Sequence, residues 1–329
     1  MKILITGGAG YIGSHMLVKT LIDGHDVVVV DNLSNSNLKN IHNIQSKISK
    51  PFHFIEDTIL NEGAMDEIFN EFNFDAVLHF AGLKSITESF ARKEHYFENN
   101  VQGSNILRVL AKKYNVNKFI FSSSANVYGT VNRSPIKETD NLNPESPYGK
   151  TKQHFENDLI SDPYFANQKE CYILRYFNPV GSWLKYSIGE VVDSTKSNIF
   201  PMIVNSLRNN EPFKIFGTDY KTKDGTAIRD YIHIIDLIEA HYACLESDKK
   251  GINIYNVGTG IGYTVNEVLN TYKKVNNVDM MIEKASKRQG DASEVYASNK
   301  RICEDLKWTP KYDLAQMCYD VHRYSFHLM

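Results

Sequence analysis

Three side chains, Ser124, Tyr148 and Lys152, have the types and spacing needed to remove a proton from a hydroxyl group. An apolar run over residues 118–122 predicts a buried strand, which would leave Ser124 at its carboxyl end. In open parallel sheets, ligands bind at that edge. A helix that begins at Pro147 puts Tyr148 and Lys152 at positions i and i+4, so both side chains would emerge on one face.

The chemistry explains why a tyrosine and a lysine would be paired. A free phenol has a pKa of about 10, and bringing it to about 7 takes roughly 4 kcal/mol of preferential stabilisation of the phenolate. A fixed ammonium and a second cation, such as an oxidised nicotinamide, can supply it. The Ser124 hydroxyl would share the transferred proton. The same Tyr-x-x-x-Lys spacing occurs at 114/118 and 296/300, and packing on a helix surface is the alternative at 148/152.

The amino terminus contains a glycine-rich loop between a predicted strand and a predicted helix. Residues 2–6 are apolar and lead into the loop at 7–13, which contains Gly7, Gly10 and Gly13. Glycine lets backbone N–H groups approach a pyrophosphate at the start of a helix. Asp31 ends the next strand, 18 residues after Gly13, and suits a carboxylate that accepts both ribose hydroxyls. Such a carboxylate repels a 2′-phosphate, so NAD is predicted rather than NADP; a glycine-rich turn with a surface aspartate is the alternative.

Further candidates for cofactor contact follow the next two predicted strands. Asp57 comes after the third strand and is a plausible partner for adenine. Lys84 lies in a small-residue turn after the fourth strand and would meet a phosphate, unless it is a solvated surface lysine. Asn99 and Asn100 interrupt the helical pattern of residues 88–114. Asparagine is a poor helix former, so a side chain turned toward the cofactor is expected there.

The second half of the chain offers candidates for substrate contact. Phe216 ends a small predicted strand and would flank a flat base, with core packing as the alternative. Arg229 would bind a phosphate through two hydrogen bonds. A salt bridge from Arg229 to Asp230 or Asp236 is the alternative. The stretch 288–291 carries a second basic and acidic pair near a turn.

Composition favours small-molecule chemistry. The chain has 329 residues, 42% of them apolar, and its 37 basic and 39 acidic side chains give a net charge of −2. Scattered charges of this kind predict no contact with nucleic acid or an anionic membrane. The four cysteines show no Cys-x-x-Cys spacing, so neither a metal site nor a disulfide is predicted, and a reducing cytoplasm is expected. The first residues leave no room for a signal peptide, and no apolar run approaches 18 residues.

Strands and helices alternate over residues 2–181, which predicts an α/β fold with a doubly wound parallel Rossmann sheet. We expect an NAD-binding domain over 1–177, with part of 230–258 returning to it. Residues 178–329 would form mainly a smaller, mixed α/β substrate domain. No linker separates the two, so they are expected to be interleaved.

Taken together and in order, the motifs resemble those of the UDP-glucose 4-epimerase family, within the extended short-chain dehydrogenase/reductases. The resemblance runs nearly end to end and is carried by Thr6-Gly-x-x-Gly10-x-x-Gly13, Asp31-Asn-Leu, His79-Phe-Ala-Gly-Leu-Lys84, Ser122-Ser-Ser, Tyr148-x-x-x-Lys152, Arg175-Tyr-Phe-Asn-Pro-Val-Gly181 and Arg229-Asp-Tyr-Ile-His233. It implies an isomerase with a tightly held NAD, a UDP-hexose substrate and a homodimer whose interface uses two helices of each subunit.

The resemblance also assigns roles by position. Tyr148 matches the base, Lys152 the residue that lowers its pKa and binds the nicotinamide ribose, and Ser124 the hydrogen-bonding relay. The positions that match cofactor contacts are Gly7, Gly10, Tyr11, Ile12, Gly13, Asp31, Asn32, Asp57, Ile59, Phe80, Ala81, Lys84, Asn99, Ser122 and Phe177, together with Tyr148 and Lys152. The positions that match substrate contacts are Asn178, Asn198, Phe216, Arg229, Tyr231, Arg288, Asp291 and Val295, together with Ser124 and Tyr148. In the family's reaction, the base takes the proton of the sugar 4-hydroxyl while C4 gives hydride to NAD, and the 4-keto sugar turns over before hydride returns.

Three departures from the family pattern bear on the substrate. Asn126 stands where many members carry threonine, and the loop 182–196 differs from the usual pattern, so its contacts are unassigned. Val295 stands where some members carry a bulky tyrosine and others a small residue. We therefore hypothesise that Val295 leaves room for a 2-N-acetyl group.

Other functions remain open on the sequence. A sugar-nucleotide 4,6-dehydratase needs an acid beside the serine, and Ala125-Asn126 supplies none. A UDP-glucuronate decarboxylase is a second alternative. A noncatalytic NAD sensor would keep the glycine loop and typically lose the base, whereas Ser124, Tyr148 and Lys152 are all present.

Overall fold

A computed structural model describes residues 1–130, 133–192, 198–288 and 291–328. The contacts divide the chain into two compact units, each assembled from separate segments. Unit 1 comprises Met1–Gly129, Asn141–Tyr176 and Ile238–Tyr255, and unit 2 comprises Thr130–Asp140, Phe177–Leu237 and Asn256–Met329. The chain therefore crosses between the units several times, as expected for interleaved segments.

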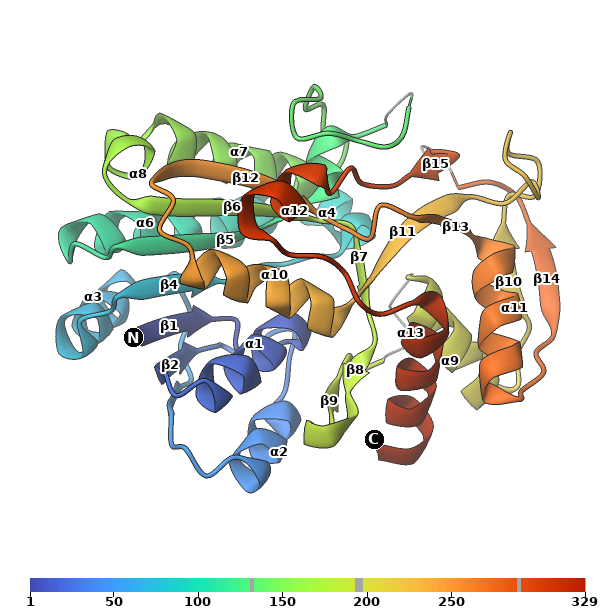
Figure 1. The fold of residues 1–329 in the computed structure, drawn as a ribbon, viewed down its shortest axis with the longest axis horizontal. Helices are drawn as coiled ribbons and strands as arrows, with labels where there is room; N and C mark the ends of the chain where they lie inside the picture. Colours follow the sequence, from blue (N-terminus) through green and yellow to red (C-terminus); the bar gives the residue numbers. More distant parts are fainter. Residues whose placement is uncertain (131–132, 193–197, 289–290, 329) are drawn as a thin grey trace. The chain divides into compact units, whose positions relative to one another are not determined.

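Unit 1 is built on a seven-stranded sheet with the order β12-β6-β5-β4-β1-β2-β3 (Figure 1). The strand pairs from β6 to β3 are parallel. Strands covered by helices on both faces carry continuous apolar runs, and the Val27–Val30 run of β2 is fully buried in this way. The predicted doubly wound α/β fold is confirmed. The strands are β1 (Lys2–Thr6), β2 (Asp26–Val30), β3 (His53–Ile55), β4 (Ala76–His79), β5 (Lys118–Ser124), β6 (Glu170–Tyr176) and β12 (Gly251–Val257).

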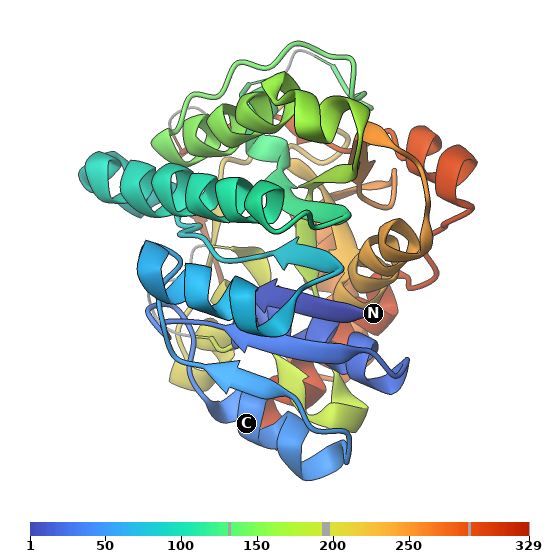
Figure 2. The ribbon, with the colours of Figure 1, turned by 90° about the vertical axis from the view of Figure 1, so that its left-hand side faces the viewer.

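The helices of unit 1 form a layer on each face of this sheet. Helices α3, α6 and α7 lie side by side on one face, and α1 and α10 lie on the other (Figures 1 and 2). The helices are α1 (Tyr11–Ile22), α2 (Lys39–Lys47), α3 (Glu62–Phe72), α4 (Ile86–Ala91), α5 (Lys93–Phe97), the π-helix η1 (Glu98–Gln102), α6 (Gly103–Lys113), the 3-10 helix η2 (Ala125–Tyr128), α7 (Pro147–Ser161), α8 (Pro163–Asn167) and α10 (Ile234–Glu246).

Strand register brings the candidate motifs to one edge of the sheet. Thr6 lies opposite His79 on the neighbouring strand, and His79 lies opposite Phe121. The last residue of β5, Ser124, lies opposite Tyr176. Because parallel strands end at the same edge, the glycine loop, the turn after β4 and the serines of β5 all emerge there.

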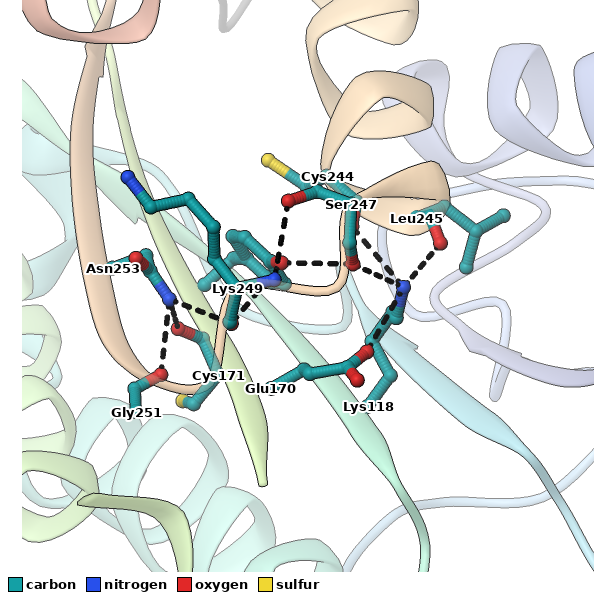
Figure 3. Close-up of polar contacts among 10 residues, drawn as sticks. Lys118, Glu170, Cys171, Cys244, Leu245, Ser247, Lys249, Gly251 and Asn253 are labelled. Carbon is teal, nitrogen blue, oxygen red and sulfur yellow. Dashed lines mark hydrogen bonds and ion pairs between the residues drawn. The ribbon is translucent and has the colours of Figure 1, made fainter. Parts of the chain in front are cut away.

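A buried lysine fastens the returning segment 238–255 to the sheet. Lys118 of β5 donates from Nζ to carbonyl oxygens in the last turn of α10 and to that of Ser247 just after it, at 2.7 Å. The same Nζ pairs with Glu170 of β6 at 3.1 Å (Figure 3). The Tyr172 hydroxyl also donates to the Ser247 carbonyl, at 3.0 Å. The last carbonyls of a helix have no partner within the helix, and a cation satisfies them. This cluster explains why residues late in the chain belong to unit 1.

Unit 2 is a smaller mixed α/β unit. Strand β11 is its centre: it pairs antiparallel with β13 and parallel with β15 and β7. Its elements are β7 (Asn178–Val180), β8 (Ser182–Trp183), the 3-10 helix η3 (Leu184–Tyr186), β9 (Ile188–Gly189), α9 (Ile199–Asn209), β10 (Phe213–Phe216), β11 (Ile228–His233), β13 (Gly262–Thr264), α11 (Val265–Asn276), β14 (Ile282–Ala285), β15 (Glu294–Val295), α12 (Lys300–Leu306), α13 (Leu314–Arg323) and the π-helix η4 (Tyr324–Leu328). The loop 182–196 begins as the short β8–β9 hairpin, and its residues 193–196 lie outside the described part of the chain.

None of the helices formed by the described residues is both long and apolar enough to cross a membrane. Among the same residues, no three histidine, cysteine or acidic side chains are grouped so as to hold a metal ion.

Candidate active site

The three candidate catalytic side chains lie at one strand end and the first turns of one helix. Helix α7 begins at Pro147, and Ser146 caps it by accepting from the Gly149 N–H at 3.0 Å. This fixes Tyr148 in the first turn and Lys152 one turn later, as the spacing predicts. Ser124 ends β5. All three are buried, with 9%, 6% and 7% of Tyr148, Lys152 and Ser124 exposed.

Lys152 is held by the backbone of the adjacent strand. Its Nζ donates to the Ser122 carbonyl at 2.8 Å and lies 4.8 Å from the centroid of the Phe121 ring. The same Nζ is 6.0 Å from the centroid of the Tyr148 ring. Burial lowers the pKa of Lys152 to about 8, although the Glu156 carboxylate opposes this by favouring the ammonium. Burial therefore acts against the ammonium that the chemistry requires, and Glu156 acts in its favour.

Tyr148 is a neutral phenol when only protein groups surround it. Burial raises the pKa of Tyr148 above its usual value, and a hydrogen bond with Ser124 acts in the opposite direction. The predicted role of Lys152 in lowering this pKa stays a prediction. A bound oxidised nicotinamide would supply the second cation that favours the phenolate.

Asn126 donates two hydrogen bonds to the Ser124 hydroxyl and so determines its hydrogen-bonding role. The Ser124 Oγ accepts from the Asn126 backbone N–H at 3.2 Å and from its Nδ2 at 3.0 Å. A hydroxyl has two lone pairs and one hydrogen, so these two bonds leave Ser124 a donor. A donor directed at Tyr148 favours the phenolate, which agrees with the effect of Ser124 on the phenol's pKa. The asparagine at this position therefore supports Ser124 instead of disturbing it.

The glycine loop leaves no space for side chains at two positions. Gly7 has a φ of +73°, and a Cβ there would lie 2.6 Å from the Ala81 nitrogen. A Cβ on Gly13 would lie 2.2 Å from the Gly7 carbonyl oxygen. The loop can therefore pack against the turn after β4 and lead directly into α1 only with glycine at both positions.

A cavity lies between the glycine loop, the end of β2 and the turn after β4. It brings together most of the candidate cofactor residues and also borders seven that were not predicted as cofactor contacts: Val30, Ser34, Asn35, Ser36, Thr58, Gly82 and Leu83. The predicted residues that line it are Gly7, Gly10, Tyr11, Ile12, Gly13, Asp31, Asn32, Asp57, Ile59, Phe80, Ala81, Lys84 and Asn99. The polar run after β2 was the available signal for Ser34 to Ser36.

The Asp31 carboxylate is already well hydrogen-bonded. One oxygen accepts from the Ala9 N–H at 2.9 Å, and the other from the Leu33 N–H and the Ser36 hydroxyl, both at 2.9 Å. A carboxylate offers about four lone-pair sites, so two ribose hydroxyls fit only if Ser36 turns away. The fixed negative charge at this end of the cavity fits NAD better than a 2′-phosphate.

Asn99 and Asn100 make different contacts, although the same role was predicted for both. Asn99 lines the cavity and donates to the Asn100 Oδ1 at 2.9 Å. Asn100 is buried and binds both backbone groups of Leu83, accepting at 2.8 Å and donating at 2.9 Å. The two residues lie in the π-helix η1, so a wider turn interrupts the helix here. Asn100 thus fixes the turn that Asn99 faces.

Ser122 belongs to a hydrogen-bonded chain that the motifs did not reveal. Its hydroxyl donates to the Tyr176 hydroxyl at 2.5 Å, which contacts the His241 Nε2 at 2.5 Å. The His241 ring lies 5.0 Å from that of Phe80, which lines the cavity. Tyr176 and His241 are 65 residues apart in sequence, so no local pattern could connect them.

In unit 2, Arg229 pairs with Asp291 and also donates to the Ile228 carbonyl at 2.7 Å. The alternative salt bridge to Asp230 or Asp236 is therefore wrong. Asp230 points elsewhere and accepts from the Thr259 N–H at 2.8 Å. Neighbouring strand residues face opposite sides of a sheet, which separates Arg229 from Asp230. The predicted pairing of Arg229 with a phosphate stays a prediction.

The remaining substrate candidates fall into two groups within unit 2. The Arg288 guanidinium lies 4.1 Å from the centroid of the Phe216 ring, and Val295 is the register partner of Arg229 on the adjacent strand. The second group surrounds β7 and the start of α9: Asn178 donates to the Asp230 carbonyl at 2.7 Å, and Asn198 precedes α9 as its N-cap residue. Tyr231 is buried with its ring edge-on to that of Phe200, and Phe177 is also buried. Gln289 and Gly290, within the predicted 288–291 pair, lie outside the described residues.

Comparison with known proteins places this site in a family. The sequence model of the NAD dependent epimerase/dehydratase family matches residues 3–258. A UDP-glucose 4-epimerase of Bacillus subtilis is 40% identical over 99% of this chain and 97% of its own length. The crystal structure of a UDP-glucose 4-epimerase from Stenotrophomonas maltophila, with bound NAD and formylated UDP-arabinopyranose, superposes with a TM-score of 0.94 at 36% identity, covering 99% of this chain and 98% of the other. The UDP-Glc/GlcNAc 4-epimerase of Campylobacter jejuni matches with a TM-score of 0.86 at 36% identity, covering 98% of each chain.

The chain belongs to the NAD dependent epimerase/dehydratase family. Within that family its similarity is to UDP-glucose 4-epimerases, so the resemblance inferred from the motifs is confirmed. The predicted isomerase class and the choice of NAD as cofactor are confirmed with it.

Proposed function

We propose that this chain interconverts UDP-galactose and UDP-glucose at C4 of the sugar, with Tyr148 as the base. The observation that carries the proposal is the position of Tyr148, Lys152 and Ser124 at the edge of the sheet onto which the glycine-lined cavity opens. A Cβ on Gly82, a residue of that cavity, would lie 3.5 Å from the Lys152 Nζ. The proton-accepting group and the candidate cofactor site are therefore neighbours within unit 1.

The protein residues account for the proton, whereas NAD, held by the residues of the cavity, would supply the hydride chemistry at C4. Tyr148 accepts the proton of the 4-hydroxyl, because Ser124 donates to the developing phenolate and Lys152 places an ammonium beside it. Burial keeps bulk water from these groups, so the 4-keto sugar is protected until hydride returns. The same three residues act in both directions of the reaction.

We assign the cofactor to the cavity of unit 1. The N–H groups at the start of α1 face a pyrophosphate, Asp31 binds the adenosine ribose and Asp57 lies near the adenine. Lys84 contacts a phosphate, and Asn99 contacts the nicotinamide end together with Ser122 and Phe177. This assignment gives the NAD domain the boundaries 1–177, with part of 230–258.

We assign the UDP part of the substrate to unit 2. Arg229 exchanges its carboxylate partner Asp291 for the diphosphate, which explains why a guanidinium that is 19% exposed already has an acidic partner. Phe216 and Arg288 flank the uracil ring, while Asn178, Asn198 and Tyr231 contact the ribose and phosphates. Residues 178–329 would thereby form mainly the substrate domain, apart from the segment 238–255 that belongs to unit 1.

The first experiment is the interconversion of UDP-galactose and UDP-glucose by the purified protein without added NAD. Conversion supports both the reaction and a cofactor retained through purification. If neither sugar converts even with NAD added, the proposal fails. Assays with dTDP-glucose and UDP-glucuronate then decide between a dehydratase, a decarboxylase and a noncatalytic NAD-binding protein.

We also propose that the enzyme accepts the N-acetylated pair, UDP-N-acetylglucosamine and UDP-N-acetylgalactosamine. Val295, on β15, is the register partner of Arg229 on β11, and its side chain is small. A Val295→Tyr variant is expected to lower kcat/KM for the N-acetyl pair by about 10- to 100-fold and to leave the unmodified pair within a few fold, because a pocket that loses volume excludes the larger sugar. Val295→Ala is the matched control and should retain both activities. Refusal of the N-acetyl sugars by wild type and Val295→Tyr alike contradicts the idea.

The predicted homodimer is proposed to form through α6 and α7. Helices α6 and α7 lie side by side (Figure 2). Apolar side chains are exposed on them and on the preceding α5: Phe97 is 43%, Val109 49% and Ile160 42% exposed. Phe97, Val109 and His154 line a shared surface groove. A surface of this kind matches the two helices per subunit that the family resemblance implies.

A Val109→Glu variant is expected to be a monomer by light scattering after size exclusion, whereas wild type elutes as a dimer. Charged side chains are depleted from the cores of dimer interfaces because their desolvation is costly. Met281→Glu is the matched control, since Met281 is likewise 50% exposed but belongs to unit 2 and to neither of the helices concerned. A Val109→Glu protein that stays dimeric places the interface elsewhere.

A further inference from the structure

A buried ion pair lies directly behind the catalytic residues. Glu156, one turn after Lys152 on α7, has no exposed surface and accepts from the Arg175 Nη2 at 2.6 Å and Nε at 3.0 Å. It also accepts from the Ser123 hydroxyl at 2.5 Å. Arg175, on β6, donates to the Tyr128 hydroxyl at 2.9 Å. The pair thus connects four elements around the site: α7, β6, β5 and the 3-10 helix η2.

Stability alone gives no reason to keep such a pair. Moving both charges out of water costs about as much as their attraction returns, and replacement of a buried pair by apolar side chains is often neutral or stabilising. The location of the Glu156–Arg175 pair, more than its contribution to stability, indicates its role. Ser123 precedes Ser124, and Tyr128 ends the 3-10 helix that contains Asn126, the residue that orients the Ser124 hydroxyl.

We propose that the Glu156–Arg175 pair is a positioning unit for catalysis: it fixes the strand end that carries Ser124, and its carboxylate keeps the Lys152 ammonium charged. The inference rests on the proposed function of Tyr148, Ser124 and Lys152. Glu156 and Arg175 touch no reacting atom and act through Ser123, Tyr128 and Lys152.

The electrostatic half of this proposal follows from the groups that face Lys152. Burial alone lowers the pKa of Lys152, and Glu156 is the group that raises it. From β4, His79 also faces Lys152, but burial lowers the pKa of His79 to about 3, so it is neutral and provides no charge. Tyr148, on the same helix, is neutral until it ionises. Loss of the Glu156 charge therefore moves the deprotonation of Lys152 to lower pH.

The test is a Glu156→Gln variant, which keeps the shape of the side chain and removes its charge. The basic limb of its kcat–pH profile is expected to move about one unit toward lower pH, which lowers kcat about tenfold on that limb. A purely structural role would lower kcat without moving the limb. Arg175→Lys is the conservative control, because it keeps both charges and should keep the wild-type limb.

A second variant covers the case in which Glu156→Gln does not fold, since it leaves a buried guanidinium unpaired. Glu156→Gln/Arg175→Met removes both charges and should recover a folded protein. It still lacks the carboxylate beside Lys152, so the shifted limb should persist. A double variant with the wild-type limb overturns the inference.

A direct measurement separates this inference from the proposed function. Competitive acetylation of amines by acetic anhydride as a function of pH, read by peptide mass spectrometry, reports the titration of Lys152, with the exposed Lys150 of the same helix as reference. A midpoint lower by about one unit in Glu156→Gln supports the inference even if the wild type does not epimerise UDP-sugars. An unchanged midpoint overturns it even if the wild type is an active epimerase.

Discussion

A Tyr148→Phe variant is expected to keep its fold and its NAD and to lose turnover by about 10²- to 10⁴-fold, the contribution typical of a positioned general acid–base group. The substitution removes one oxygen and leaves the ring, which packs against Leu83 and Tyr96 in a small buried cluster. The remaining phenyl ring cannot accept the 4-hydroxyl proton. Initial rates with UDP-galactose, together with the NAD released on denaturation, measure both halves of the expectation.

Tyr96→Phe is the matched control for this variant. Tyr96 is a second buried phenol in the same cluster, and its hydroxyl contacts the Glu88 Oε2 at 3.1 Å, away from Ser124 and Lys152. It should keep turnover within a few fold of wild type. A near-normal rate for Tyr148→Phe, with NAD retained, removes Tyr148 from the mechanism and leaves Ser124 and Lys152 without the base they are proposed to assist.

The local parts of the fold could be predicted because short patterns encode them. A run of valines between Asp26 and Val30 can be satisfied only by burial on both faces, which a parallel sheet provides. Gly13 is required by the Gly7 carbonyl six residues earlier, and Gly7 by its own positive φ of +73°. The helix start at Pro147 follows from its fixed φ and from the Ser146 cap.

The parts that could not be predicted depend on contacts between distant segments. The Tyr176–His241 contact spans 65 residues, and the Glu156–Arg175 pair joins a helix to a strand. Arg175 and Tyr176 belong to a recognisable motif, but neither that motif nor the helical patterns around Glu156 and His241 show which side chains they contact. Asn100 could be suspected as a poor helix former, yet only the fold shows that it holds Leu83 while Asn99 faces the cavity.

The wrong expectation for Arg229 has the same origin. Its neighbours in sequence, Asp230 and Asp236, were the obvious acidic partners. Strand geometry turns Asp230 to the other face, where it binds the backbone of Thr259 and Gly260, and Asp236 accepts from the Lys311 N–H at 3.0 Å. The actual partner, Asp291, approaches from a segment 62 residues later. Proximity in sequence predicts ion pairs on helices, where i and i+4 face one side, much better than on strands.

A Lys118→Met variant is expected to lose about 3–5 kcal/mol of unfolding free energy, the largest stability effect we predict for a single substitution. Only 7% of the Lys118 side chain and 8% of that of its partner Glu170 are exposed. Removing the ammonium leaves the Glu170 carboxylate buried without its counter-ion. It also leaves the carbonyls at the end of α10, including that of Ser247, without their donor (Figure 3). Urea unfolding followed by circular dichroism measures the loss, compared at a constant slope.

The double variant Lys118→Met/Glu170→Met decides which of these two losses dominates. If the unpaired carboxylate is the main cost, removing its charge restores most of the stability. If the helix carbonyls are the main cost, the double variant stays as unstable as Lys118→Met, because neither methionine can donate a hydrogen bond to them. Lys113→Met is the matched control, since its pair with Asp66 is exposed and worth little. Lys118→Met with wild-type stability contradicts the view that this cluster fastens α10 and β12 to the sheet, and with it the physical reason for the return of residues 238–255 to unit 1.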